Sequence, residues 1–224
     1  MSWGAIVVAA GRGTRFGSPK QLISVAGRPL LAWCLSTFAT IDELGRVVVV
    51  TENEWLAQVD ALARACLGEK YGGVVAGGST RQQSVACGLA ALDPACTRVF
   101  VHDGARPLVR ADDVRAGMER THAGQGAVLA APVVDTIKVV DPRTMLVERT
   151  LERSRLWAAQ TPQFATRDDL ERAHASAAEN RLDLTDDVAL LEVAGTTVVV
   201  VPAHGENFKV THPSDLARAE ALLR

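Results

Sequence analysis

Three glycines and three basic side chains lie in one short stretch near the N-terminus, AAGRGTRFGSPKQL at 9–22. They are Gly11, Gly13, Gly17, Arg12, Arg15 and Lys20. Glycines let backbone N–H groups approach an anion closely, and those groups are themselves donors. Several cations in the same loop favour a polyphosphate over the single pyrophosphate of a dinucleotide. The spacing G-x-G-x-x-x-G fits neither the dinucleotide fingerprint nor the P-loop. The stretch therefore predicts polyphosphate binding, with an ordinary flexible loop as the alternative.

This loop follows the first of several apolar runs of strand length. The runs are nearly continuous, without in/out alternation, so both faces of each strand should be covered. They are 5–10, 47–51, 99–102, 127–132 and 197–201. Stretches of helical period lie between them, at 29–38, 54–67, 81–92 and 112–121, the last with Asp112 as the expected N-cap. The order predicts an α/β, doubly wound, mostly parallel sheet with the loop at its carboxyl edge, where ligands bind.

Residues 133–157 break this rhythm. Within them, 137–140 and 146–151 read as two strands around Asp141-Pro142, a turn signal. We expect one domain, 1–224, with 133–157 as an inserted β-hairpin arm. An isolated hairpin is marginal in water, so an arm rich in Arg and apolar residues needs a partner. Exchange of arms in a homodimer, each arm completing its partner's active site, would cover this surface.

Composition narrows the class of protein. The 224 residues are 48% hydrophobic, enough for one well-buried core. A formal net charge of −2 argues against a general nucleic-acid or anionic-membrane binder. The cysteines form no C-x-x-C pair and read as buried reduced thiols. The N-terminus lacks a charged n-region, and no apolar run approaches about 18 residues. We expect a cytoplasmic protein.

The loop and six later blocks together resemble one enzyme family, the 2-C-methyl-D-erythritol 4-phosphate cytidylyltransferases of the non-mevalonate isoprenoid pathway. The loop carries AAG, RGTRFG and PKQ in that order. The later blocks are GGSTRQQSV at 77–85, VHDGARP at 101–107, APVVDTIK at 131–138, LWAAQTPQF at 156–164, LTDD at 184–187 and ENFKVTHPSDL at 206–216. The resemblance spans nearly the whole chain. It implies a Rossmann-like nucleotidyltransferase fold and transfer of CMP from CTP to the polyol phosphate, with release of pyrophosphate.

The resemblance also implies roles for individual residues. The catalytic cations are Arg15, Lys20 and Lys209. The nucleotide site comprises Ala9, Ala10, Gly11, Gly13, Gly78, Ser84 and Asp103. The polyol-phosphate side comprises Thr136, Arg153, Thr161, Thr185 and Arg106. The implied cofactor is Mg²⁺, held by Asp103 together with the CTP phosphates, since one carboxylate plus phosphate oxygens is the usual arrangement.

Several of these residues have simpler interpretations. Lys20 and Arg153 can be solvated surface cations, and Ser84 a serine on a helix face. Asp103 can cap the following turn or pair with Arg106. His102 reads as a packed strand-end histidine rather than an acid or base. Asp186 either meets a substrate hydroxyl or caps a helix beginning near Asp187.

Two positions depart from the family pattern. Val8 stands where a proline often precedes AAG, and Ser79 stands where an acidic residue is common. The implied chemistry needs no covalent nucleophile, because a phosphate monoester is already anionic at neutral pH.

The nearest alternative is a ribitol-5-phosphate cytidylyltransferase. A second alternative is a nicotinamide-dependent dehydrogenase, which would carry an acidic residue about 20 residues after its glycine loop. In this sequence that region, 29–39, is apolar instead. A silent nucleotide-binding regulator would be expected to lack Lys20 or Lys209.

Overall fold

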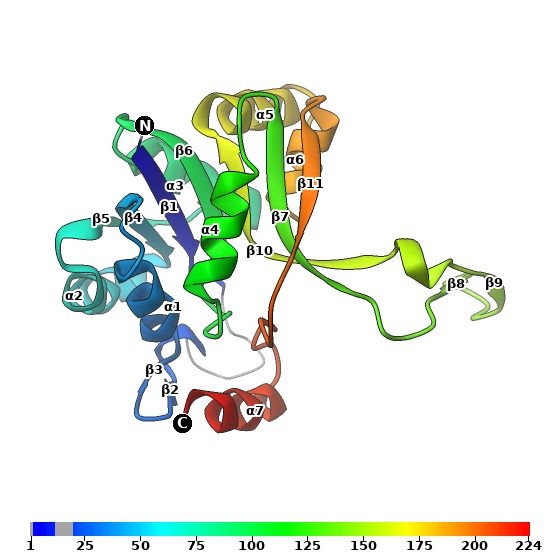
Figure 1. Ribbon diagram of the computed structural model, residues 1–224, viewed down its shortest axis with the longest axis horizontal. Helices are drawn as coiled ribbons and strands as arrows, with labels where there is room; N and C mark the ends of the chain where they lie inside the picture. The colour runs from blue at the N-terminus through cyan, green and yellow to red at the C-terminus, as the bar shows by residue number, and fades with distance from the viewer. Residues whose placement is uncertain (1, 12–19) are drawn as a thin grey trace.

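A seven-stranded sheet forms the centre of the structure, a computed structural model that describes residues 2–11 and 20–224 (Figure 1). Its strand order is β11-β7-β10-β6-β1-β4-β5. The bounds are β1 Ser2–Val8, β4 Leu44–Thr51, β5 Tyr71–Ala76, β6 Cys96–Asp103, β7 Gln125–Pro132, β10 Trp157–Thr166 and β11 Thr197–Pro202. A small pair, β2 Ser24–Val25 and β3 Arg28–Pro29, precedes the first helix.

Six of the seven strands run in the same direction. β1 pairs in parallel with β4 and β6, β4 with β5, and β11 with β7, whereas β10 is antiparallel to both β6 and β7. The predicted α/β, mostly parallel sheet is confirmed. All five strands predicted from apolar runs are present, and the sequence prediction lacked β5 and β10.

Helices cover both faces of the sheet, as continuous apolar strands require. One core cluster packs α1 (Leu30–Ala39), α2 (Leu56–Leu67) and α4 (Ala111–Glu119) against the sheet. A second cluster packs α3 (Arg81–Ala91), α5 (Arg167–Glu179) and α6 (Asp187–Val193) on the other face. The C-terminal α7 (Pro213–Leu223) packs through Ala219 against Val25 and Leu30.

Short 3-10 turns complete the element list: η1 Lys20–Leu22, η2 Asn53–Trp55, η3 Gly68–Lys70 and η4 Arg153–Arg155. One predicted helix start is wrong. α4 begins at Ala111 with Arg110 as its N-cap residue, so Asp112 lies inside the first turn. There its carboxylate still complements the positive end of the helix, which explains why the residue resembles a cap.

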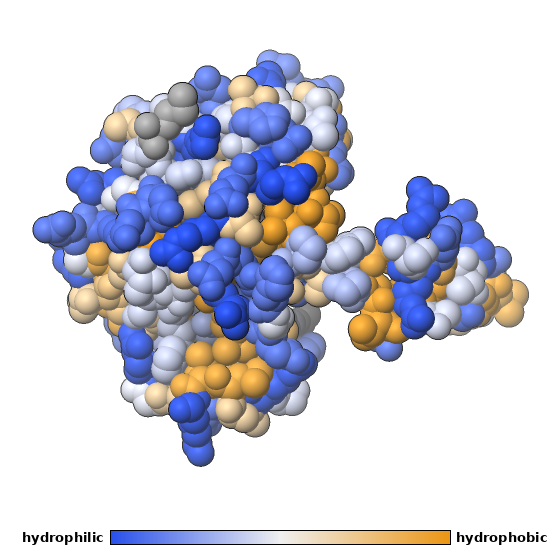
Figure 2. All heavy atoms as spheres, in the orientation of Figure 1, coloured by the Kyte–Doolittle hydropathy of each residue, from blue (hydrophilic) through white to orange (hydrophobic). Residues whose placement is uncertain are grey.

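The hairpin arm extends away from the sheet between β7 and β10 (Figure 1). Its strands are β8 (Lys138–Val140) and β9 (Val147–Thr150), which pair antiparallel around the predicted Asp141 turn. At the base of the arm, the Val133 N–H donates to the Leu156 carbonyl at 3.1 Å. The arm is therefore a long insertion in the connection between the antiparallel strands β7 and β10. Apolar side chains on it are exposed, with Val134 at 78% and Met145 at 70% (Figure 2).

No helix within residues 2–11 and 20–224 is long and apolar enough to cross a membrane.

Candidate active site

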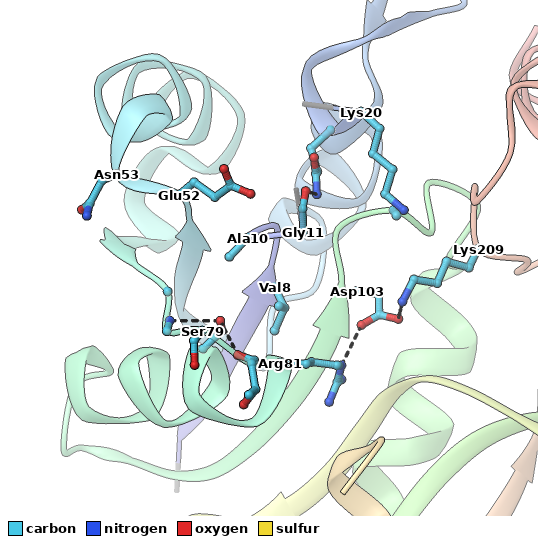
Figure 3. A pocket seen from close by; sticks show the side chains of 16 residues that line it. Val8, Ala10, Gly11, Lys20, Glu52, Asn53, Ser79, Arg81, Asp103 and Lys209 are labelled. Carbon is cyan, nitrogen blue, oxygen red and sulfur yellow. Dashed lines mark hydrogen bonds and ion pairs between the residues drawn. The ribbon is translucent and has the colours of Figure 1, made fainter. Parts of the chain in front are cut away.

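A pocket of about 560 Å³ opens at the carboxyl ends of β1, β4, β5 and β6. This volume lies in the ordinary range for small-molecule sites. The pocket has two chemically different ends (Figure 3). Lys20, Lys209 and Asp103 lie on one side, while Glu52, Asn53 and Ser79 lie on the other. Ala10, Gly11, Gly78 and Ser84, which the sequence analysis assigned to a nucleotide site, also line it. Ala9 is buried behind it, with its N–H donating to the Val50 carbonyl at 2.7 Å.

The wall at the Glu52 end is built around the glycine pair Gly77-Gly78. A side chain on Gly77 would lie 2.7 Å from both the Ala10 Cβ and the Ser84 Oγ, and one on Gly78 would lie 2.4 Å from the Gln83 Cβ. Only glycine therefore fits at either position. The Gly78 N–H donates to the Ser84 Oγ at 3.2 Å, and that hydroxyl donates to the Thr80 carbonyl at 2.9 Å. In this structure Ser84 shapes the turn that forms the pocket wall.

Asp103 is the centre of the lysine end. Its Oδ1 accepts from Arg81 Nε at 3.2 Å and its Oδ2 from Lys209 Nζ at 2.8 Å, with Arg106 Nε at 3.8 Å. Burial alone would raise the pKa of this carboxyl, but Arg81, Lys209 and Arg106 together hold it well below its usual range. Asp103 therefore stays ionised and fixes cations beside the pocket. The interpretation that pairs Asp103 with Arg106 is confirmed as one part of this network.

Lys20 lies close to the segment that carries Lys209, although the two residues are near opposite ends of the sequence. Its Nζ donates to the carbonyl of Val210, the residue after Lys209, at 3.0 Å. The Val210 N–H in turn donates to the Ala105 carbonyl at 2.8 Å, which holds the late segment against the end of β6. The fold thus brings the two predicted catalytic lysines to one pocket. Four other residues that the sequence analysis named in the glycine loop lie outside the described residues: Arg12, Gly13, Arg15 and Gly17.

His102 is a packed histidine, as the simpler interpretation held. It is fully buried, and burial lowers its pKa to about 4. The neutral ring is expected to donate from Nε2 to the Arg106 carbonyl (3.1 Å) and to accept at Nδ1 from the Thr161 hydroxyl (3.2 Å). The Thr161 Oγ1 also accepts from the Asp103 N–H at 3.0 Å. Thr161 therefore positions the strand end that carries Asp103.

The predicted polyol-side residues fall into two groups. Arg106 is mostly buried near Asp103 and donates from Nη1 to the Asn207 carbonyl at 2.7 Å. Thr185 is exposed just before α6, where Asp186 caps the helix by accepting from the Ala189 N–H. Thr136 and Arg153 lie instead on the protruding arm, both exposed, with Arg153 donating to the Val134 carbonyl. None of the five polyol-side residues lines the pocket, although Thr161 and Arg106 contact Asp103, which does.

Two charged pocket residues were missed in the sequence. Arg81 bridges Asp103 and Asp187, the latter at 2.8 Å, although 106 positions separate it from Asp187. As the first residue of a helix it resembles a surface cation, and no local signal marks its pairing. Glu52 was missed as well. A signal existed there, because Glu52 directly follows an apolar strand, as Asp103 ends another.

The donor set at the lysine end is suited to magnesium only if the ligand brings most of the oxygens. The described residues contain no group of three His, Cys, Asp or Glu side chains that could hold a metal ion. Asp103 offers one carboxylate, and each of its oxygens keeps lone-pair capacity beyond the cation it already accepts from. One carboxylate combined with phosphate oxygens is an ordinary magnesium arrangement.

A mostly parallel sheet, a nucleotide-sized pocket at its carboxyl edge and lysines at one end of that pocket define the class: the chain is a nucleotidyltransferase. More narrowly, it belongs to the IspD family, 2-C-methyl-D-erythritol 4-phosphate cytidylyltransferase, whose family model matches residues 4–224.

Individual relatives agree with this membership. The 2-C-methyl-D-erythritol 4-phosphate cytidylyltransferase of Streptomyces avermitilis is 44% identical, covering 98% of this chain and 90% of its own. That of Halalkalibacterium halodurans is 39% identical, covering 100% and 97%. Among solved structures, the enzyme of Thermus thermophilus superposes with a TM-score of 0.80 at 33% identity, covering 99% of this chain and 98% of its own. The 4-diphosphocytidyl-2C-methyl-D-erythritol synthase of Anaerococcus prevotii gives 0.87 at 26% identity, with the same coverage.

Proposed function

We propose that this enzyme transfers CMP from CTP to 2-C-methyl-D-erythritol 4-phosphate and releases pyrophosphate. The observation that carries the proposal is the convergence of Lys20, Asp103 and Lys209 at one end of the pocket. These residues come from the beginning, middle and end of the chain. A site with cations at one end and a glycine-walled surface at the other suits a nucleoside triphosphate.

In the proposed reaction a phosphate oxygen of the polyol phosphate forms a bond to the α-phosphorus of CTP. The bond from that phosphorus to the β-phosphate bridging oxygen breaks, and pyrophosphate leaves with the electron pair. Negative charge spreads over the α-phosphate oxygens in the transition state, so fixed cations lower the barrier. Lys20 and Lys209 supply such cations from the described residues, and Arg15 is proposed to join them. Asp103 holds Lys209 in place through its 2.8 Å contact.

Mg²⁺ is the proposed cofactor, with Asp103 as its one protein ligand and the CTP phosphates as the others. Bound there, the ion would supply charge neutralisation to the triphosphate. Removal of divalent cations with EDTA should abolish turnover, and added MgCl₂ should restore it. Turnover that continues at full rate in EDTA would remove the metal from the proposal.

We propose further that residues 1–224 form one domain and that the 133–157 arm is exchanged in a homodimer. Exposed apolar side chains on the arm support this, because a lone two-stranded hairpin cannot bury them. Thr136 and Arg153 support it too, since they are exposed on the arm and contribute nothing to the pocket of their own chain. In the dimer they would complete the acceptor side of the partner's site.

Subunit complementation tests the shared site. Lys20→Ala and Arg153→Ala subunits, each inactive alone, are mixed and allowed to reassort. About half the dimers are then mixed, and each mixed dimer has one site with both defects and one with neither. About a quarter of the wild-type activity should return. Mixing Arg153→Ala with itself is the control. No recovery, with mixed dimers shown to form, would mean that the arm serves its own chain.

The cellular location proposed is the cytoplasm. Cys34, Cys66, Cys87 and Cys96 are all free, and Cys34 and Cys96 are buried. Free thiols on a chain of this size suit a reducing compartment.

A crossed pyrophosphate-release assay tests the activity itself. Each of the four common ribonucleoside triphosphates is combined with either 2-C-methyl-D-erythritol 4-phosphate or ribitol 5-phosphate. CTP with the methylerythritol phosphate should give the highest kcat/KM. Faster turnover of ribitol 5-phosphate would assign the enzyme to the alternative polyol, and release with no dependence on either acceptor would contradict both.

A further inference from the structure

A buried carboxylate oxygen at the end of the pocket away from the lysines has nothing to accept from. Glu52 lines the pocket, and its Oε1 is buried with no hydrogen-bond partner among the residues that the structure describes. A buried acceptor without a donor destabilises the protein, and for one that lines a pocket a bound ligand can supply the donor. We propose that Glu52 accepts a hydrogen bond from the 4-amino group of cytosine and so selects CTP over UTP. The proposal rests on the proposed use of CTP.

The backbone holds Glu52 firmly at the place where a base would lie. Glu52 immediately follows β4, one residue beyond Thr51, whose carbonyl accepts from the Gly77 N–H at 2.8 Å. On its other side the Glu52 carbonyl accepts from the Trp55 N–H at 3.0 Å. The carboxylate therefore lies beside the glycine wall, and Figure 3 shows it across the pocket from Lys20 and Lys209. If the triphosphate binds at the lysines, the base lies at the Glu52 end.

The chemistry of the two pyrimidines makes a carboxylate selective. Cytosine presents an amino group at position 4, which donates, whereas uracil presents a carbonyl oxygen there, which only accepts. An ionised carboxylate only accepts, so it pairs with cytosine and repels the uracil oxygen.

The other polar side chains near this end discriminate less strongly between the two bases, because none of them carries a charge. The Ser79 hydroxyl donates to Gln83 Oε1 at 2.8 Å, and the Ser84 hydroxyl donates to the Thr80 carbonyl. Asn53 carries both a donor and an acceptor, so its amide can serve either base. Among the described residues lining this end, Glu52 is the one acidic side chain, so it repels a uracil oxygen most strongly.

Isothermal titration of CTP and of UTP, in magnesium and without any acceptor, tests the assignment. Glu52→Gln removes the charge with little change of shape. The wild-type preference for CTP, expressed as the ratio of the two Kd values, should fall at least about tenfold in this variant. Glu54→Gln is the matched control, because Glu54 is exposed and lies outside the pocket; its ratio should equal that of the wild type.

A ligand change tests the same contact without relying on a mutant fold. Pyrimidin-2-one ribonucleoside triphosphate lacks the 4-amino group, and wild type should bind it about tenfold more weakly than CTP. An unchanged CTP/UTP ratio in Glu52→Gln, or equal weakening of both nucleotides, would overturn the proposal. Equal binding of CTP and the pyrimidinone analogue by wild type would overturn it too. Because binding is measured without the polyol phosphate, these outcomes are independent of whether that acceptor is the true one.

Discussion

Arg81→Met removes a cation from between two buried carboxylates. Arg81 contacts Asp187 at 2.8 Å and Asp103 at 3.2 Å, and the Asp187 side chain is only 2% exposed. Burial alone would lower the pKa of Arg81, but the two carboxylates outweigh it and raise that pKa above its usual range. In the variant Asp103 keeps Lys209 and Arg106, whereas Asp187 keeps no other salt-bridge partner among the described residues.

The expected loss of stability follows from that asymmetry. Removing one partner of a buried ion pair destabilises a protein by about 3–5 kcal/mol, because the remaining charge stays buried. Arg81 is itself partly exposed, so the lower figure, about 3 kcal/mol, applies to this site. For a protein of this size that corresponds to a melting temperature lower by about 6–12 °C. Adding Asp187→Asn should recover about 1–2 kcal/mol, because it removes the stranded charge.

Urea denaturation and thermal melts of the variants supply the measurement. Arg224→Met is the matched control, since Arg224 pairs with Glu220 on the exposed C-terminal helix and its loss should change stability by less than about 0.5 kcal/mol. If Arg81→Met melts like this control, or if the double variant is no more stable than Arg81→Met, the buried network does not hold the site together as argued.

Three further results are expected. Lys20→Ala should lower kcat by about 10²–10³-fold, since one preorganised donor contributes about 3–4 kcal/mol, with a smaller change in KM for CTP; a folded variant within about threefold of wild type would contradict this. His102 stays neutral down to its lowered pKa of about 4, while in the unfolded chain it binds a proton below about pH 6.5. The free energy of unfolding should therefore decrease by up to about 3 kcal/mol as the pH is lowered from about 6.5 to about 4, and His102→Gln should make it less dependent on pH in this range, as measured by urea unfolding. Burial raises the pKa of the Cys34 thiol to about 12, so a thiol reagent at about pH 8 should modify the half-buried Cys66 and Cys87 first; equally fast loss of Cys34 would contradict its burial.

The sheet was predictable wherever a strand contains an unbroken apolar run. β1, β4, β6 and β7 carry such runs, and the burial of most of these residues explains them. The edge strand β11 carries one as well, although only Val201 in it is buried. β5 escaped prediction because it is an edge strand whose sequence, YGGVVA, contains two adjacent glycines, which are poor strand formers. β10 escaped because it contains Gln160, Pro162 and Gln163. The structure satisfies Gln163 through the backbone N–H groups that open α6, a partnership between distant segments.

The site was predictable as far as strand ends and family blocks reach. Asp103 ends β6 and Gly78 follows β5, and the carboxyl ends of parallel strands meet at one edge. Contacts that depend on tertiary packing were not predictable. Thr161 hydrogen-bonds to His102 and to the Asp103 backbone N–H. Arg81 pairs with Asp187, which lies more than a hundred residues away in the sequence, so no local pattern predicts its role. The position of Glu52 directly after an apolar strand places it at the carboxyl edge, but only the pocket reveals its buried oxygen.

Label tracking tests the central claim most directly. The enzyme is incubated with magnesium, 2-C-methyl-D-erythritol 4-phosphate and CTP labelled with radioactive phosphorus at either the α or the γ position, and the products are separated. Transfer of CMP requires the α label to appear in a new cytidine diphosphate ester of the polyol and the γ label to appear in pyrophosphate, in equal amounts. If the α label instead stays in free CMP, or the γ label is released as inorganic phosphate or reaches the polyol, the enzyme is not a cytidylyltransferase for this acceptor.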